Sequence, residues 1–160
     1  MHTSVLRWGE RTIREHELSS LPTLEVGSLD YNGALKPYFT GRYVGVDMRS
    51  GANVDIVALA YSLPFRDSAW PVIVCTEMLE HDRCFWKSIP EMARVLAPGG
   101  RLLLTTRGIG FPVHRHPSDY WRFTPEAVEA LLTDAGLNVL ESVEDDPYWP
   151  GVLALATKPV

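Results

Sequence analysis

Two glycines and two aspartates near the N-terminus have the types and spacing to bind a nucleoside. Gly27 and Gly33 lie in the segment TLEVGSLDYNG, and the next strand-like run, YVGVD, ends at Asp47. A strand, a glycine-containing turn, a helix and a second strand ending in a carboxylate form the nucleoside site of Rossmann-like folds. Asp30 lies in the loop that would face a pyrophosphate, and its carboxylate would repel phosphate. The pattern therefore predicts a nucleoside without phosphates, and a positively charged one suits Asp30.

A second group of candidate side chains, Glu77, Glu80 and His81, directly follows the apolar run PVIVCT. Open α/β sheets bind ligands at the carboxyl ends of their strands, so this group is expected beside the ligand. His81 is a candidate general base because imidazole titrates near neutral pH. Glu77 is a second candidate, because a carboxylate can also accept a proton. The alternative is that Glu80 and His81 only cap or brace the helix that follows.

A third group lies in the loop FPVHRHPSDYWRF, residues 111–123. Its density of histidine, charge and aromatic rings predicts a lid or an acceptor site, with His114 and His116 as further candidate bases and with His116, Asp119, Tyr120 and Arg122 as candidate acceptor-binding residues. The alternative is a structural brace in which Asp119 pairs with Arg122 while Trp121 and Phe123 pack in the core. His114, His116 and Asp119 also have the ligand types of a metal site. Because no fourth ligand is evident, the sequence predicts no metal.

Composition limits the class of protein. The chain has 160 residues, 46% of them hydrophobic, which predicts a single globular domain, residues 1–160. A net charge of −5 predicts no nucleic-acid partner. No apolar run approaches the roughly 20 residues needed to cross a bilayer, and the charged N-terminus is unlike a signal peptide. Cys75 and Cys84 are expected to be small core residues in a reducing compartment, and the predicted location is cytoplasmic.

Hydrophobic periodicity and turn residues predict an α/β fold with a seven-stranded, mostly parallel sheet and a C-terminal antiparallel hairpin. The predicted strands are Leu24–Val26, Tyr43–Val46, Asp55–Ala58, Pro71–Thr76, Arg101–Thr105, Leu137–Ser142 and Val152–Thr157. The predicted helices are Ser4–Leu18 with an interruption at Gly9, Ala34–Phe39 broken near Pro37, Ser88–Ala97 with a Ser88–Glu91 capping box, and a helix from Pro125 to Ala135. The N-terminal helical segment, residues 1–20, is expected to cover one rim of the ligand cleft.

Six motifs in order resemble the class I S-adenosylmethionine-dependent methyltransferases, particularly the small type-11 branch. The motifs are LEVGS, YVGVD, the LPF of residues 63–65, CTEMLEH, VLAPGG and LLLTT. The resemblance implies a single Rossmann-like methyltransferase domain with S-adenosylmethionine as the cofactor, which is a cationic nucleoside without phosphate. It implies that Gly27 allows close backbone approach, that Glu25 orients the amino-acid end, and that Asp47 binds the ribose hydroxyls. The full predicted cofactor site is Glu25, Gly27, Ser28, Asp30, Asp47, Met48, Ala60, Leu63, Thr76 and Glu77.

The chain departs from the family pattern at three places. The first motif is GSLDYNG, two residues longer than the usual GxGxG, so Asp30 or Asn32 would replace ordinary backbone contacts. Leu59 stands where this branch often has an aspartate for the adenine, and Pro71 replaces a common aspartate.

The expected function is methyl transfer from S-adenosylmethionine to a small-molecule acceptor, and the alternative is a non-catalytic S-adenosylmethionine-binding domain of the same fold. A nicotinamide oxidoreductase is disfavoured by Asp30 and by the missing glycines. The sequence leaves the acceptor and the oligomeric state open.

Overall fold

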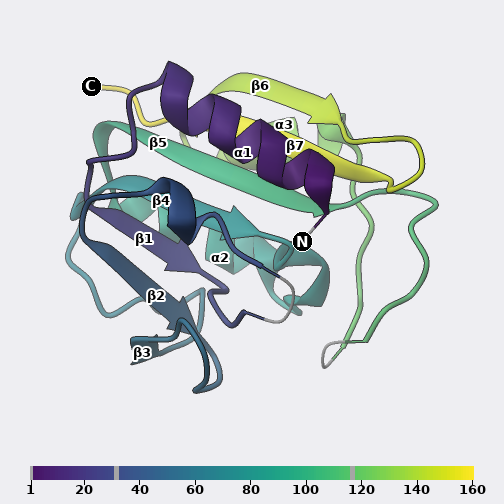
Figure 1. The fold of residues 1–160 in the computed structure, drawn as a ribbon, viewed down its shortest axis with the longest axis horizontal. Helices are drawn as coiled ribbons and strands as arrows, with labels where there is room; N and C mark the ends of the chain where they lie inside the picture. The colour runs from purple at the N-terminus through teal and green to yellow at the C-terminus, as the bar shows by residue number, and fades with distance from the viewer. Residues whose placement is uncertain (1, 31–32, 116–117) are drawn as a thin grey trace.

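The computed structural model describes residues 2–30, 33–115 and 118–160 of the chain. The described strands form one seven-stranded sheet in the order β3-β2-β1-β4-β5-β7-β6 (Figure 1). Strands β1 to β5 are parallel, while β7 is antiparallel to both β5 and β6. The strand bounds are β1 Thr23–Val26, β2 Tyr43–Asp47, β3 Ile56–Val57, β4 Trp70–Thr76, β5 Leu96–Arg107, β6 Asn138–Glu144 and β7 Gly151–Thr157. The predicted mostly parallel sheet with a C-terminal antiparallel hairpin is confirmed.

Helices cover both faces of the sheet. Helix α1, Thr3–Glu15, lies on one face, and α2, Phe85–Val95, and α3, Pro125–Asp134, lie on the other (Figure 1). Strand β4 contributes side chains to the hydrophobic core on both faces of the sheet, because successive side chains of a strand point to opposite faces. Val72 and Val74 pack with α1, whereas Ile73 and Cys75 pack with α2 and α3. Cover on both faces explains why this strand is a continuous apolar run in the sequence.

Helix α1 is continuous through Gly9, whereas an interruption was predicted there. A Cβ atom at Gly9 would lie only 2.5 Å from Cδ2 of Leu35, which is fully buried. The glycine therefore allows α1 to pack closely on the segment before the 3-10 helix η1, Lys36–Tyr38. That short helix replaces the predicted Ala34–Phe39 helix, since Pro37 lies within it.

The predicted start of α2 at Ser88 is wrong, because the helix begins at Phe85. Asp82 makes the earlier start possible, since its carboxylate accepts hydrogen bonds from the Cys84 N–H at 2.8 Å and from the Ser88 hydroxyl at 2.5 Å. Ser88 is therefore within the helix instead of capping it. The predicted partner, Glu91, binds other groups, so the expected capping box is absent.

Helix α3 confirms its predicted capping signals. The hydroxyl oxygen of Thr124 accepts a hydrogen bond from the Ala127 N–H at 3.2 Å, and Pro125 is the first helical residue. Gly136 follows the helix with φ of +81°, the left-handed conformation that glycine adopts without strain.

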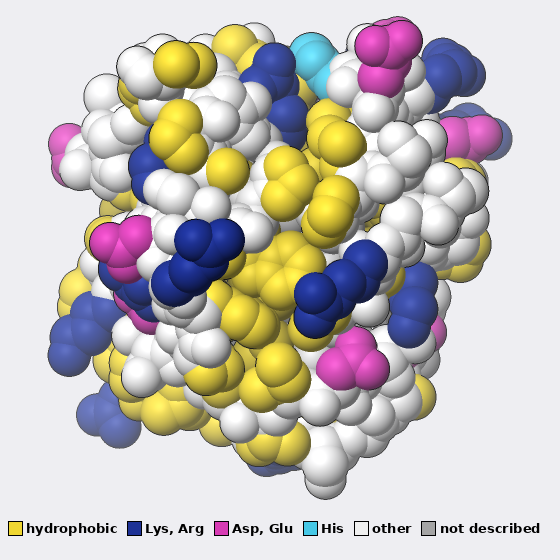
Figure 2. Space-filling view, turned by 90° about the vertical axis from the view of Figure 1, so that its left-hand side faces the viewer, with side chains coloured by type: hydrophobic (Ala, Val, Ile, Leu, Met, Phe, Trp, Pro, Cys, Tyr) yellow, Lys and Arg dark blue, Asp and Glu magenta, His cyan; other side chains and the backbone are white. Residues whose placement is uncertain are grey.

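The amino ends and the carboxyl ends of the parallel strands lie on opposite sides of the molecule. Figure 2 shows the molecule from the left-hand side of Figure 1, the side from which the arrows of β1, β2 and β4 start. Hydrophobic side chains gather in the middle of this face with lysine and arginine side chains around them (Figure 2). The candidate residues follow the carboxyl ends of the strands, on the opposite side. Among the described residues, no helix is long and apolar enough to cross a membrane.

Candidate functional site

A cavity of about 810 Å³ lies at the carboxyl ends of β1, β2 and β4. This is where the strand order reverses, because β1 pairs with β2 on one side and with β4 on the other. Open α/β sheets bind ligands at such a switch point. Nine of the ten predicted cofactor residues line the cavity, namely Glu25, Gly27, Ser28, Asp30, Asp47, Met48, Ala60, Thr76 and Glu77.

Leu63 is the exception, because it lies in the core with 4% of its surface exposed and does not line the cavity. Its backbone N–H donates a hydrogen bond to Glu91 Oε1 at 2.8 Å. This bond directs the segment away from the ligand side, and the neighbouring Leu59 and Tyr61 line the cavity instead. Leu59, a departure from the family pattern, thus supplies an apolar wall.

The turn after β1 is closed by its own aspartate. Asp30 Oδ1 accepts a hydrogen bond from the Gly33 N–H at 2.6 Å, and its Oδ2 accepts one from Asn53 Nδ2 at 3.3 Å. The carboxylate therefore stabilises the longer turn while it lines the cavity. Asn32, the other residue expected to replace backbone contacts, lies outside the described residues.

Gly27 fixes the course of the same turn. Its φ is +82°, and an added Cβ would lie 2.5 Å from Cγ of Met78. The Gly27 N–H donates to the Val46 carbonyl at 2.8 Å, which holds the turn against the end of β2. Only glycine gives both the left-handed backbone and the close approach at this position.

Glu25 places a carboxyl group in a buried wall of the cavity. Its residue exposure is 2%, and among the described residues no hydrogen-bond donor reaches Oε2. Burial raises the pKa of Glu25 to about 7, while the Tyr43 hydroxyl beside it acts in the opposite direction. A buried acceptor without a donor is costly, so this oxygen suits a cationic or hydrogen-bond-donating ligand.

Asp47 is held in a fixed orientation at the end of β2. Its Oδ2 accepts a hydrogen bond from the Leu29 N–H at 3.3 Å, and its Oδ1 accepts one from the Arg49 N–H at 3.0 Å. A carboxylate oxygen can accept more than one hydrogen bond. Asp47 therefore keeps acceptor capacity toward the cavity that it lines.

Glu77 is engaged by two groups of β5. Its Oε1 accepts a hydrogen bond from the Thr105 hydroxyl at 2.8 Å, and its Oε2 contacts the guanidinium of Arg107. Its backbone adopts the left-handed conformation, with φ of +55°. Sequence reasoning missed Arg107, which is 1% exposed; its signal was a charged residue ending the apolar strand LLLTTR. Burial lowers the pKa of Arg107 to about 10, so it stays charged at neutral pH.

The loop after β5 is braced by an ion pair. Arg122 contacts both carboxylate oxygens of Asp119, at 2.5 and 2.7 Å, and this pairing holds the pKa of Asp119 well below its usual range. Asp119 and Arg122 do not line the cavity, whereas Tyr120 does. The Tyr120 N–H donates to the Glu80 carbonyl at 2.8 Å, which attaches the loop beside the cavity. His116 lies outside the described residues.

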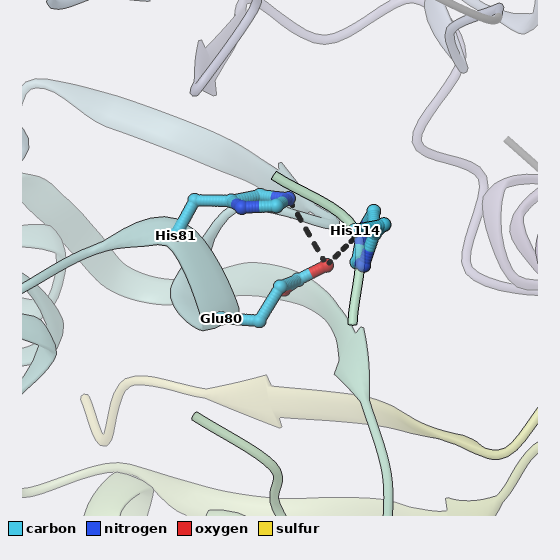
Figure 3. A group of neighbouring side chains, drawn as sticks. All are labelled: Glu80, His81 and His114. Carbon is cyan, nitrogen blue, oxygen red and sulfur yellow. Dashed lines mark ion pairs between the residues drawn. The ribbon is translucent and has the colours of Figure 1, made fainter. Parts of the chain in front are cut away.

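Glu80, His81 and His114 meet beside this loop (Figure 3). Glu80 Oε1 lies 3.8 Å from His81 Nε2 and 4.0 Å from His114 Nε2. Glu80 and His81 belong to the 3-10 helix η2, Leu79–His81, and His114 comes from the loop. Burial, followed by the charge of His81, lowers the pKa of His114. Sequence reasoning considered the two histidines separately, because no local pattern connects η2 to the loop.

A family model described as a methyltransferase domain, of the type-11 kind, matches residues 24–104, about half of the chain. This match covers the turn after β1, the end of β2, and η2. A comparison with curated proteins finds no significant match.

Solved structures share the fold at low sequence identity. The 1,6-didemethyltoxoflavin-N1-methyltransferase of Burkholderia thailandensis, with bound 1,6-didemethyltoxoflavin and S-adenosylhomocysteine, has a TM-score of 0.79 at 16% identity, over 98% of this chain and 79% of that chain. The cyclase SpnF has a TM-score of 0.77 at 19% identity, over 97% and 82% of the two chains. A methyltransferase of Methanosarcina mazei that depends on S-adenosylmethionine has a TM-score of 0.72 at 19% identity, over 93% and 97%.

Proposed function

Because the chain belongs to the class I S-adenosylmethionine-dependent methyltransferases of the type-11 kind, we propose that it transfers a methyl group from this cofactor to a small-molecule acceptor. One observation carries the proposal. A single cavity of about 810 Å³ is lined both by the predicted cofactor residues and by the loop residues Ser118 and Tyr120. Small-molecule sites commonly enclose about 300–1,000 Å³, so this cavity has the size of a ligand site.

The residues present fit S-adenosylmethionine. No donor among the described residues reaches Oε2 of Glu25, so this oxygen suits the ammonium group, and Asp47 retains acceptors for the ribose hydroxyls. The left-handed Gly27 lets the backbone approach the ligand without a side chain between them. When bound, the cofactor supplies a methyl group on a sulfonium, which is already an activated leaving group.

The chain's own contribution is alignment and exclusion of water. Both carboxylate oxygens of Glu77 are already engaged, Oε2 by the Arg107 guanidinium and Oε1 by the Thr105 hydroxyl, which makes Glu77 the weaker candidate for a base. A base is needed only if the acceptor is a hydroxyl or a protonated amine. His81 and His114, which line the same cavity, stay the candidates for that role, and His116 stays one from the sequence alone.

The alternative is a non-catalytic domain that binds S-adenosylmethionine. It is favoured by the engaged state of Glu77 and by the fold likeness to a protein named as a cyclase, since one fold can serve several activities. Incubation with radiolabelled S-adenosylmethionine and a panel of hydroxyl, amine and carboxylate acceptors decides between them. Labelled product from any acceptor excludes the alternative, whereas cofactor binding without product across the panel supports it.

Asp47→Ala is expected to weaken binding of S-adenosylhomocysteine by about 10- to 100-fold, because hydrogen bonds to a charged group contribute about 1.5–3 kcal/mol. Isothermal titration calorimetry measures the change. Asp134→Ala, which removes an exposed carboxylate at the end of α3, is the matched control and should leave affinity unchanged. No binding by the unchanged protein at millimolar ligand would contradict the proposed function itself.

Gly27→Ala is expected to abolish detectable S-adenosylhomocysteine binding and to lower stability by about 1–2 kcal/mol. The left-handed backbone disfavours any Cβ, and the new methyl would meet Met78 at 2.5 Å. Gly33 offers a control, because its φ is +102° but an added Cβ meets nothing within 4 Å. Gly33→Ala should therefore lower stability through its left-handed backbone, but it should weaken S-adenosylhomocysteine binding less than Gly27→Ala does. Equal affinity of Gly27→Ala and the unchanged protein would be incompatible with close backbone approach at Gly27.

A further inference from the structure

The cluster of Glu80, His81 and His114 has no role in the proposed cofactor binding, yet its atoms converge (Figure 3). One potential ligand atom from each side chain lies within 4.8 Å of the other two. Two of the three residues line the cavity, and they come from separate segments of the chain. Two segments that are distant in the sequence, η2 and the loop after β5, therefore place three potential metal-ligand atoms close together.

Both imidazole rings are oriented through their Nδ1 atoms. His81 Nδ1 donates a hydrogen bond to the Ser118 carbonyl oxygen, and His114 Nδ1 lies 3.2 Å from Asp119 Oδ2. Each ring therefore presents its Nε2 atom toward Glu80. Metal-bound histidines are held in this manner, with the second ring nitrogen against a backbone carbonyl or a carboxylate.

Glu80 presents its Oε1 atom to these two nitrogens. Its side chain has no exposed surface, and its Oε2 accepts a hydrogen bond from the Thr106 hydroxyl at 2.8 Å. Within the described part of the chain, Oε1 has no hydrogen-bond donor. A cation between Oε1 and the two Nε2 atoms would offset the cost of burying this acceptor.

We propose that Glu80, His81 and His114 bind a divalent first-row transition-metal ion, with Zn²⁺ as the best fit. Bonds of about 2.1 Å at tetrahedral angles place ligand atoms about 3.4 Å apart. The observed separations of 3.8 and 4.0 Å from Glu80 Oε1 are close to that value, so small side-chain rotations complete the site. Two imidazoles with one carboxylate disfavour Mg²⁺ and Ca²⁺, which take oxygen ligands.

Three protein ligands leave a coordination position open, as in catalytic zinc sites. Because His81 and His114 line the cavity, that position faces the space available to the acceptor. The ion would bind an oxygen donor of the acceptor, so the acceptor would be a hydroxyl, phenol or carboxylate compound. With their Nε2 atoms on the ion, His81 and His114 would act as metal ligands and not as general bases. This role rests on the proposed function, whereas binding of the ion does not.

The test is a Co²⁺ titration of the full chain after chelator treatment, followed by visible ligand-field absorption, with Zn²⁺ affinity from competition against a fluorescent chelator. One ion per chain is expected. His114→Ala, in the loop, should lower Zn²⁺ affinity by at least about 100-fold, and Asp119→Asn by about 10-fold, because outer partners of ligands contribute 10- to 100-fold. His2→Ala removes a histidine that lines the same cavity outside the cluster, and Cys84→Ser removes a partly buried thiol; both should bind as the unchanged protein does.

Acetohydroxamate, an oxygen-donor probe, should shift the Co²⁺ spectrum of the unchanged protein if the open position is accessible. Zn²⁺ binding weaker than about 100 µM, or equal affinity in His114→Ala and the unchanged protein, would overturn the metal site. An unshifted spectrum would overturn the acceptor role. Calorimetry with S-adenosylhomocysteine on the metal-free protein separates the two proposals, since cofactor binding without Zn²⁺ binding rejects only the metal site.

Discussion

Arg107→Met is expected to lower the free energy of unfolding by about 3–5 kcal/mol. The guanidinium is 1% exposed and contacts the carboxylate of Glu77, so its removal leaves a partly buried charge without its partner. It also lies over the Phe111 ring, 4.5 Å from the ring centroid, and methionine would keep only the apolar part of that contact. Urea unfolding followed by circular dichroism measures the loss.

Arg101→Met is the matched control, because this arginine lies on the same strand in a less buried position and contacts Thr157 and backbone carbonyls. Its cost should stay near about 1 kcal/mol. The double variant Glu77→Gln with Arg107→Met should be more stable than Arg107→Met alone, since no unpaired charge remains. A loss below about 1 kcal/mol for Arg107→Met, or no recovery in the double variant, would show that the pair does not stabilise the fold.

Local signals in the sequence predicted the framework of the nucleoside site. Gly27 directly follows the last residue of β1, and Asp47 is the last residue of β2. The left-handed turn and the carboxylate both follow from the residue type at these positions. The start of α3 was equally local, because Thr124 and Pro125 supply the cap within four residues. Predictions of this kind succeed where neighbouring residues within about one turn determine the local conformation.

Tertiary contacts decided what the sequence did not predict. The start of α2 depends on Asp82, which lies before the helix, and the place of Leu63 depends on Glu91 of α2. The cluster of Glu80 with His114 forms only when the loop after β5 folds back onto η2, and no spacing rule connects those segments. Arg107 lies two residues beyond the predicted strand Arg101–Thr105, and no local pattern shows that the fold buries it against Glu77.

The pH dependence of stability is expected to have an unusual sign at Glu25. Burial raises its pKa in the folded chain to about 7, from an ordinary value near 4.5. Between these values the folded chain holds a proton that the unfolded chain has released, so stability falls as the pH rises. The contribution is complete below about pH 4.5 and is lost as the pH rises through about 7, a difference of about 3 kcal/mol.

Four neighbours of Glu25 also affect this titration. The Tyr43 hydroxyl and the charge of Lys36 lower its pKa, whereas the carboxylates Asp30 and Asp47 raise it. Glu25→Gln should remove the slope between pH 4.5 and 7 and stabilise the chain at pH 8, because an amide needs no ionisation. Glu10→Gln changes an exposed glutamate of α1 and should keep the slope of the unchanged protein.

Ligand binding should respond to pH in the opposite direction. An ammonium group binds best to ionised Glu25, so the affinity for S-adenosylhomocysteine is expected to rise about 20-fold from pH 5.5 to 7.5. Calorimetry at several pH values measures this rise, and Glu25→Gln should bind more weakly at pH 7.5 with a flat profile. Parallel profiles for Glu25→Gln and the unchanged protein would mean that another group meets the cationic end of the ligand. Burial of the ionised Glu25 carboxylate lowers the stability of the fold, and a bound cation would offset that loss. Folding and ligand binding are therefore coupled at Glu25.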